Sequence, residues 1–183
     1  MNRNMLILGA GVHGRVVKEL AESLHVFEKI DFLDDDSTIE DQIGQCSNSE
    51  QLSGAYSFAF PSFVSNNLRM KWIDILEEYC YTVPVLIHPT ASISPSASIY
   101  PGSIIGANAT IGANSIVEKG CIIGLGVIID YNSFIGFGCH ISSGTIIQSH
   151  CVVKSYTTTD IGSVYTRLDM PSAEEFLGVR GFS

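Results

Sequence analysis

A glycine-rich turn near the start of the chain has the residue types and spacing of a phosphate-binding loop. Residues 9–14 read Gly-Ala-Gly-Val-His-Gly, a G-x-G-x-x-G pattern that directly follows the apolar run at residues 5–8. Glycines let backbone N–H groups approach a phosphate, and the N-terminus of a following helix favours the negative charge. The pattern therefore indicates a phosphorylated ligand. The alternative is that these glycines only permit tight packing of a helix on a sheet.

Acidic residues end the next expected strand. Residues 29–33 form an apolar-rich strand that runs into Asp34, Asp35 and Asp36. An acidic side chain at this point can accept hydrogen bonds from ribose hydroxyls or from a base. Strand, glycine turn, helix, strand and acidic end occur here in the order of a nucleotide-binding βαβ unit, so residues 1–86 predict a Rossmann-like unit. It is about half of a dinucleotide-binding fold, which favours a mononucleotide or a nucleotide sugar over NAD.

A six-residue repeat occupies residues 87–153. An Ile or Val recurs at every sixth position, and a small or compact residue stands two positions before most of them. A period of six matches neither an α-helix nor one flat strand. It matches a chain that turns a corner every six residues, so that three sides close a coil of about eighteen residues and the coils stack. The sequence therefore predicts a left-handed parallel β-helix, followed by an irregular C-terminal cap at residues 154–183.

Composition and charge limit the class of protein. The net charge of −9 argues against a nucleic-acid partner, and no apolar run has the length of a membrane span or of a signal-peptide core. We therefore expect a cytoplasmic protein without membrane insertion. The cysteine count is odd and no C-x-x-C pair occurs, which predicts reduced thiols and no metal site. The repeat contains only Glu118, Lys119 and Asp130 as charged residues, so its faces are expected to be buried in an oligomer.

The order of these motifs resembles the bacterial sugar O- and N-acyltransferases. These include sialic acid O-acetyltransferases and UDP-4-amino-sugar N-acetyltransferases. The similarity rests on the glycine turn, the strand end Phe-Leu-Asp-Asp, the junction at residues 86–95 and the hexapeptide repeats. The resemblance implies a homotrimer, acetyl-CoA as the acyl donor and a nucleotide-sugar substrate held by the N-terminal unit.

The resemblance also implies which residues contact the nucleotide sugar. The diphosphate would lie along Gly9, Gly11, His13 and Gly14, and the base or ribose would meet Asp34 and Asp35. Asn66 corresponds to the asparagine of a Gly-Asn pair in the family, although Ser65 stands here in place of the glycine.

The catalytic positions depart from the family pattern. Its base is a histidine followed by an acidic residue, and here Tyr131 and Asn132 stand at those places. A phenol, with an ordinary pKa of about 10, is a poor base at neutral pH. A second family histidine, which contacts the acetyl group, is retained as His140; its alternative role is a bond to a backbone carbonyl at a subunit interface. An active enzyme would have to use His140 or Asp130 as the base.

Two functions remain open from the sequence. The first is an acetyl-CoA-dependent acyltransferase acting on a nucleotide-linked amino or hydroxy sugar in glycan or polysaccharide synthesis. The second is a catalytically degenerate trimer that binds a nucleotide sugar or serves as a scaffold, which Tyr131, Asn132 and the short β-helix favour.

Overall fold

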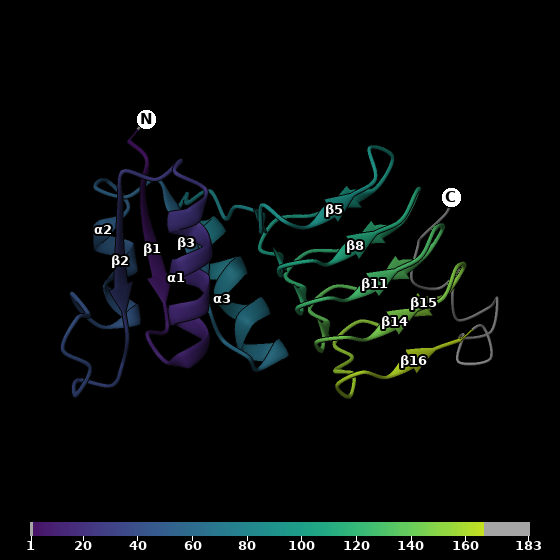
Figure 1. Cartoon of the computed structure of the whole chain (residues 1–183). Coiled ribbons are helices and arrows are strands. Elements are labelled where there is room, and N and C mark those ends of the chain that lie inside the picture. Colours follow the sequence, from purple (N-terminus) through teal and green to yellow (C-terminus); the bar gives the residue numbers. More distant parts are fainter. Residues whose placement is uncertain (1, 167–183) are drawn as a thin grey trace, which may run out of the picture.

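The computed structural model describes residues 2–166 and contains two units that lie side by side (Figure 1). The N-terminal unit is a parallel three-stranded sheet of order β2-β1-β3 with helices on both faces. Its elements are β1 (Asn4–Leu8), α1 (Val12–Ser23), β2 (Lys29–Leu33), η1 (Cys46–Asn48), α2 (Ser49–Leu52), β3 (Phe58–Pro61) and α3 (Asn66–Glu78). The Rossmann-like half-unit predicted from the sequence is confirmed.

The alternating side chains of β1 divide the core of this unit between its two faces. Met5 and Ile7 pack with Val17 and Leu20 of α1, whereas Leu6 and Leu8 pack on the face that α3 covers. Because successive residues of a strand point to opposite faces, a central strand that is covered on both sides is apolar throughout.

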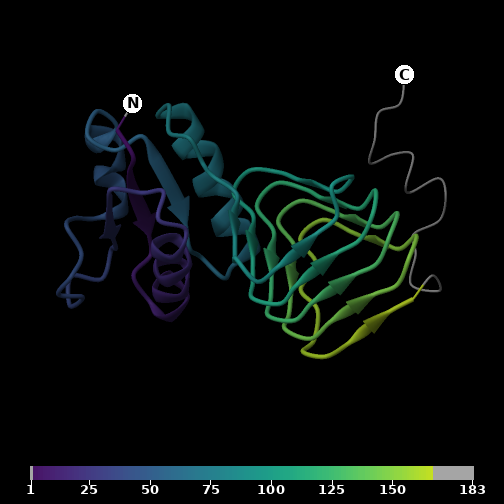
Figure 2. The ribbon, with the colours of Figure 1, turned by 45° about the horizontal axis from the view of Figure 1, so that its top comes forward.

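The second unit is a left-handed parallel β-helix, as the repeat predicts. Its coils stack as a triangular prism (Figure 2), and each strand pairs with the strand one coil further along, as Ile104 does with Ile122 and Ile122 with His140. The three faces have the strand orders β4-β7-β10-β13, β5-β8-β11-β14-β16 and β6-β9-β12-β15.

The strands of the β-helix are two residues long. They are β4 (Leu86–Ile87), β5 (Ser92–Ile93), β6 (Ser98–Ile99), β7 (Ile104–Ile105), β8 (Thr110–Ile111), β9 (Ile116–Val117), β10 (Ile122–Ile123), β11 (Ile128–Ile129), β12 (Phe134–Ile135), β13 (His140–Ile141), β14 (Ile146–Ile147), β15 (Val152–Val153) and β16 (Val164–Tyr165).

The repeated residues form the core of the prism. The aliphatics from Ile105 to Val153 are buried, and the compact residues two positions before them are buried as well. The corners turn at left-handed residues, among them Asn108, Asn114 and Asn132 with φ between 54° and 58°. Asparagine tolerates this conformation better than most side chains, which explains its place in the repeat.

The β-helix extends beyond Val153, so the boundary expected there is wrong. β16 pairs with β14 and adds to the same face, and Thr159 and Tyr165 continue the six-residue spacing. Thr159 is buried, and its hydroxyl accepts a hydrogen bond from Ser142 N (2.8 Å) and lies 3.0 Å from Thr145 Oγ1. A polar residue thus occupies an aliphatic position with its hydrogen bonds satisfied. The rest of the expected cap, residues 167–183, lies outside the described residues.

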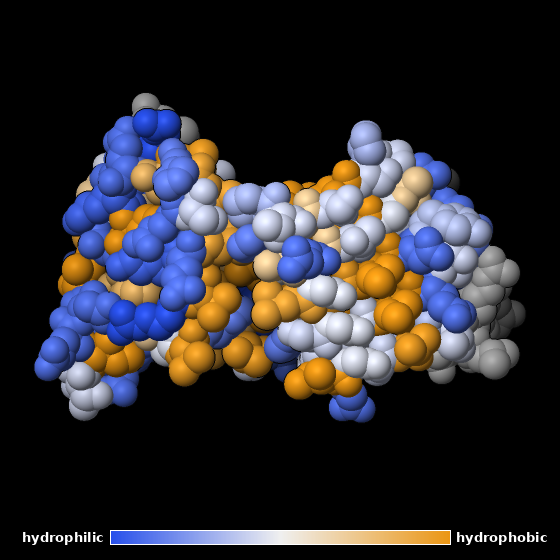
Figure 3. Space-filling view, in the orientation of Figure 1, coloured by the Kyte–Doolittle hydropathy of each residue, from blue (hydrophilic) through white to orange (hydrophobic). Residues whose placement is uncertain are grey.

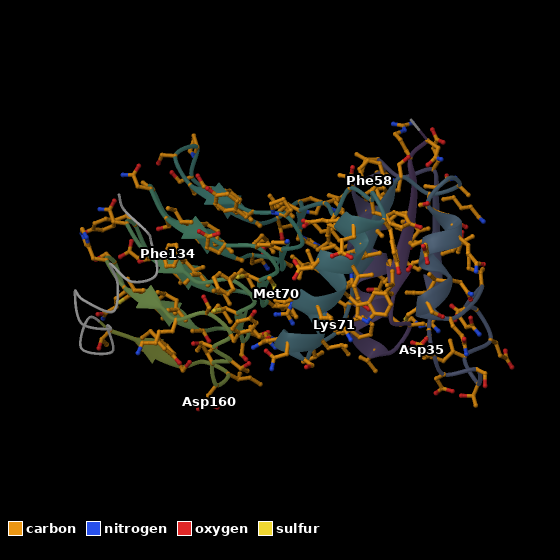
Figure 4. The ribbon with its side chains drawn as sticks, turned by 180° about the vertical axis from the view of Figure 1, so that it is seen from behind. Asp35, Phe58, Met70, Lys71, Phe134 and Asp160 are labelled. Carbon is orange, nitrogen blue, oxygen red and sulfur yellow. The ribbon has the colours of Figure 1, made fainter. Side chains whose placement is uncertain are left out.

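Helix α3 fastens the two units together. Met70, on its prism-facing side (Figure 4), lies against the corners at Gly120 and Gly138, where an added Cβ would come within 2.3 Å and 2.9 Å of Met70 side-chain atoms. Glycine at these corners therefore permits the docking as well as the turn. Within residues 2–166, no helix has the length and apolar character needed to cross a membrane.

Candidate functional site

Two cavities meet at His13, the second residue of α1. One, here called the glycine-turn pocket, lies at the carboxyl ends of β1 and β3 and is lined by the glycine turn, Asp34 and residues 62–65. The other, here called the interdomain cavity, has a volume of about 450 Å³ and lies between α1 and the β7-β10-β13 side of the prism. His13 lines both cavities, and His140 lines the second.

The three glycines of the turn differ in why glycine is needed at each position. Gly9 has a φ of +97°, and a Cβ at Gly14 would lie 2.0 Å from the carbonyl oxygen of Gly9, so tight packing requires both. Gly11 faces open space, with no atom within 4 Å of an added Cβ. Tight packing therefore explains Gly9 and Gly14 but not Gly11. Gly11 leaves room for a ligand to approach the backbone.

Asp34 and Asp35 have different structural roles. Asp34 lines the glycine-turn pocket, and its carboxylate accepts hydrogen bonds from Ala10 N at 2.6 Å and Asp36 N at 2.8 Å. Asp35 does not line the pocket and instead accepts a hydrogen bond from Cys46 N at 2.9 Å. Asp34 thus shapes the glycine turn from its side, while Asp35 holds the loop that leads to η1.

His13 is neutral at neutral pH. Its pKa is lowered to about 4, mainly by burial and further by the nearby His140 and Arg69. Its Nε2 is buried and has no hydrogen-bond partner within the described part of the chain. A neutral imidazole with an unpartnered nitrogen can accept a proton or bind a donor.

His140 projects from the prism into the interdomain cavity. Strand pairing fixes its backbone, whose N–H donates to Thr157 O at 2.8 Å and whose carbonyl accepts from Thr159 N at 3.0 Å. Burial, and then the charge of Arg69, lowers the pKa of His140 below that of an ordinary histidine. The side chain is therefore a neutral imidazole in a partly apolar cavity.

Tyr131 and Asp130 lie elsewhere on the prism. They stand at the corner between β11 and β12, where Tyr131 N donates to Asp130 Oδ1 at 2.8 Å and the Tyr131 ring packs edge-on against His150. Neither residue lines the interdomain cavity. One chain alone therefore does not bring them together with His140, because β13 lies on a different face of the coil.

Asn66 joins the two units and does not line the glycine-turn pocket. Its Nδ2 donates to Tyr156 O at 2.9 Å and Thr158 Oγ1 at 3.0 Å, and its Oδ1 accepts from Arg69 Nη2 at 2.9 Å. The residue before it, Ser65, does line the pocket.

Several lining residues had no signal in the repeat or the glycine motif. The loop after β3 supplies Ser62, Phe63 and Val64 to the glycine-turn pocket, and Glu19 and His88 line the interdomain cavity. The position of the loop could have been anticipated, since ligands bind outside the carboxyl ends of parallel strands. Within residues 2–166, no three histidine, cysteine or acidic side chains are placed to hold a metal ion.

Comparison with known proteins agrees with this architecture. Residues 4–76 match the PglD N-terminal domain, and residues 84–119 match the bacterial transferase hexapeptide, six repeats. The comparison with curated proteins found no match.

Solved structures extend the similarity over most of the chain. The acetyltransferase domain of PglB from Neisseria gonorrhoeae FA1090 is 30% identical, with 93% of this chain and 94% of that chain covered and a TM-score of 0.68. The same domain in complex with acetyl coenzyme A is 27% identical, covers 90% and 93%, and has a TM-score of 0.67. PerB from Caulobacter crescentus, in complex with CoA and GDP-perosamine, is 21% identical over 93% and 91% with a TM-score of 0.70, and it supports the fold. The chain belongs to the bacterial sugar acyltransferases that join a PglD-type N-terminal domain to hexapeptide repeats.

Proposed function

We propose that the protein transfers an acetyl group from acetyl-CoA to an amino or hydroxyl group of a nucleotide-linked sugar. The observation that carries this proposal is the position of His13, which lines both the glycine-turn pocket and the interdomain cavity. A nucleotide sugar with its diphosphate at the glycine turn would extend its sugar past His13 toward His140. The similar PglB domain binds acetyl coenzyme A, which supports the same donor here.

The chemistry requires a group that accepts one proton. The acceptor nitrogen or oxygen attacks the thioester carbonyl, the C–S bond breaks, and the proton of the acceptor must reach the departing thiolate. His140 is neutral and faces the interdomain cavity, so it is suited to contact the acetyl group or to carry this proton. Gly9, Gly11 and Gly14 would hold the diphosphate, and Asp34 would reach the ribose or base.

We also propose that the protein acts as a homotrimer in the cytoplasm. Ile128, Ile146 and Val164 form an exposed apolar column on one face of the prism (Figure 3), and a soluble monomer rarely leaves such a column uncovered. Prisms packed side by side could also bring Tyr131 and Asp130 of one subunit toward the His140 cavity of the next. A site shared in this way would account for their separation within one chain.

The second candidate function is a trimer that binds a nucleotide sugar without turnover. It is favoured by Tyr131 and by Asn132, which is a left-handed corner residue whose side chain accepts a hydrogen bond from Asn114 Nδ2 at 3.3 Å. In this case the glycine-turn pocket would bind its ligand while no acyl transfer occurs.

Calorimetric titration separates the two functions. Acetyl-CoA is titrated into the protein, with UDP and GDP titrated separately as probes of the glycine-turn pocket. The acyltransferase proposal predicts micromolar binding of acetyl-CoA that His140→Asn abolishes. His25→Asn is the matched control, because His25 is exposed in the N-terminal unit, lies outside both cavities and has a φ of 52° that asparagine tolerates. Binding of a nucleotide without acetyl-CoA would sink the acyltransferase and favour the second candidate.

A further inference from the structure

Arg69 of α3 is a fully buried cation whose hydrogen bonds all end on neutral oxygens in the described part of the chain. Burial lowers its pKa to about 10, so it stays charged at neutral pH. Its acceptors are the backbone oxygens of Phe63, Val64, Gly120, Gly138 and Cys139, at 2.8 to 3.3 Å, and the side-chain oxygen of Asn66.

These acceptors belong to the two halves of the proposed site. Phe63 and Val64 form one wall of the glycine-turn pocket. Gly138 and Cys139 immediately precede His140, whose ring lines the interdomain cavity. A single guanidinium therefore bonds the nucleotide side and the acetyl side at once: its Nη1 lies 2.9 Å from Phe63 O, and its Nη2 lies 3.1 Å from Gly138 O.

Contact between the two units would not by itself require an arginine at position 69. A buried charge without a counter-ion is costly, and an apolar side chain at the same contact would avoid that cost. Met70 and Ile73 of the same helix already provide apolar contact with the prism corners. What arginine adds is a planar fork that fixes several carbonyls in one arrangement, which the single ammonium of a lysine cannot reproduce.

The charge also acts on the two histidines. Arg69 lowers the pKa of both His13 and His140, after the larger effect of burial. Other titratable groups also line these cavities: Asp34 shares the glycine-turn pocket with His13, and Glu19 of α1 and His88 after β4 line the interdomain cavity. The thiols of Cys121 and Cys139 lie near Arg69 itself. A loss of the positive charge should therefore raise the pKa of both imidazoles.

We propose that Arg69 is a positioning residue that holds the wall of the glycine-turn pocket and the strand bearing His140 in one fixed arrangement. The inference rests on the proposed function only for its effect on turnover. Its effects on ligand binding and on the His140 ring are properties of the folded protein and need no identified sugar acceptor.

The test compares the full-length wild type with Arg69→Lys and Arg69→Met. Lys71→Met is the matched control, because Lys71 is an exposed cation on the same helix (Figure 4). Binding of UDP and of acetyl-CoA is measured by calorimetry, folding by urea denaturation, and the ring signals of His13 and His140 by nitrogen-15 NMR as a function of pH.

We expect the geometry of the guanidinium to determine ligand binding and its charge to determine the pKa values of the two histidines. Arg69→Lys retains low histidine pKa values but weakens UDP and acetyl-CoA binding together, by about tenfold or more. Arg69→Met weakens both and also raises the pKa of His13 and His140. Lys71→Met leaves binding and both pKa values unchanged. In a turnover assay, Arg69→Lys lowers kcat, again by about tenfold or more, because a small displacement of a reacting group is costly.

Arg69 variants that are less stable but bind both ligands as the wild type does, with unaltered His140 signals, would overturn the proposal. If the wild type binds neither UDP nor acetyl-CoA, the proposed function fails, while the His140 signals of the Arg69 variants still decide this inference. If neither Arg69 variant folds, NMR spectra of the wild-type protein with and without UDP test the proposal instead. The positioning role then requires that a ligand at the glycine turn, with UDP as the probe, shifts the Arg69 Nε–H and His140 signals together, and unshifted signals contradict it.

Discussion

His13 on α1 and His140 on β13 line one cavity although they belong to different structural units, and His140 contributes to the low pKa of His13. In this partly buried space a charge on His140 disfavours the protonation of His13, and the charge of Arg69 acts in the same direction. The α/β unit and the β-helix thus meet at a pair of neutral bases.

This relationship predicts how the stability of the protein depends on pH. The pKa of His13 is about 4 in the folded protein and about 6.5 in an unfolded chain, so between these values the unfolded state binds more protons. The free energy of unfolding should therefore fall as the pH falls from 6.5 to 4, with a contribution from His13 on the order of 1 to 3 kcal/mol. Urea denaturation at a series of pH values measures it.

Replacement of His13 by asparagine should flatten this pH dependence. His25→Asn is the matched control, because His25 is exposed and sits at a φ of 52° that asparagine accepts. His13→Asn and wild-type curves that stay parallel from pH 6.5 to pH 4 would show that His13 is not held neutral by folding.

The glycine turn gives a second prediction from a pair of substitutions. Gly14→Ala places a Cβ 2.0 Å from Gly9 O and should destabilise the protein by on the order of 2 to 4 kcal/mol. Gly11→Ala meets no atom within 4 Å and should change the stability by less than about 0.5 kcal/mol. If a diphosphate binds at this turn, Gly11→Ala should nevertheless weaken UDP binding. Denaturation and calorimetry on the same two samples check both halves, and full UDP affinity in Gly11→Ala would exclude Gly11 from the site.

The fold could be read from the sequence because each element has a local signal. The six-residue spacing alone places the β-helix strands from β4 to β15. The last coil was missed because Thr159 replaces an aliphatic and is held by hydroxyl hydrogen bonds, a substitution that a hydrophobic pattern does not register.

The site was only partly predictable for a physical reason. Gly9, Gly11, His13, Gly14 and Asp34 do line one pocket, since they follow from a single local motif. Asn66 bridges the two units, and Arg69 has no local signal, because the partners that join them to the prism include backbone oxygens far away in the chain, such as Tyr156 O for Asn66 and Gly138 O for Arg69. Contacts to distant carbonyls depend on the docking of two units, which no short pattern encodes.

The exposed column of the β-helix predicts a third outcome. If Ile128, Ile146 and Val164 are covered by a neighbouring subunit, Ile128→Asp should convert a trimer into monomers, because it places a charge in an apolar contact. Light scattering coupled to size-exclusion chromatography gives the mass directly. Val26→Asp, an exposed apolar position in the N-terminal unit, should leave the trimer intact. A wild type that is monomeric at micromolar concentration contradicts the expectation.

The corner at Tyr131 carries the fourth prediction, which concerns turnover. Tyr131 is 46% exposed at a corner of the prism, and its backbone N–H bonds to Asp130, so a histidine can replace its ring without disturbing the core. If the tyrosine marks weakened chemistry at a retained site, Tyr131→His should raise the rate of thiol release from acetyl-CoA by about 100-fold, the usual contribution of a general base. The assay uses UDP- and GDP-linked 4-amino sugars as acceptors.

Tyr100→His is the matched control, because Tyr100 is similarly exposed in the first coil of the prism and should not affect the rate. The stability of both variants should stay within about 0.5 kcal/mol of the wild type, as is usual for exposed positions. A Tyr131→His protein that binds acetyl-CoA and a nucleotide sugar but turns over no faster than the wild type would show that the missing histidine does not limit the reaction. A rate gain confined to Tyr131→His would instead place this corner in contact with the acceptor, and therefore place the reaction between two subunits.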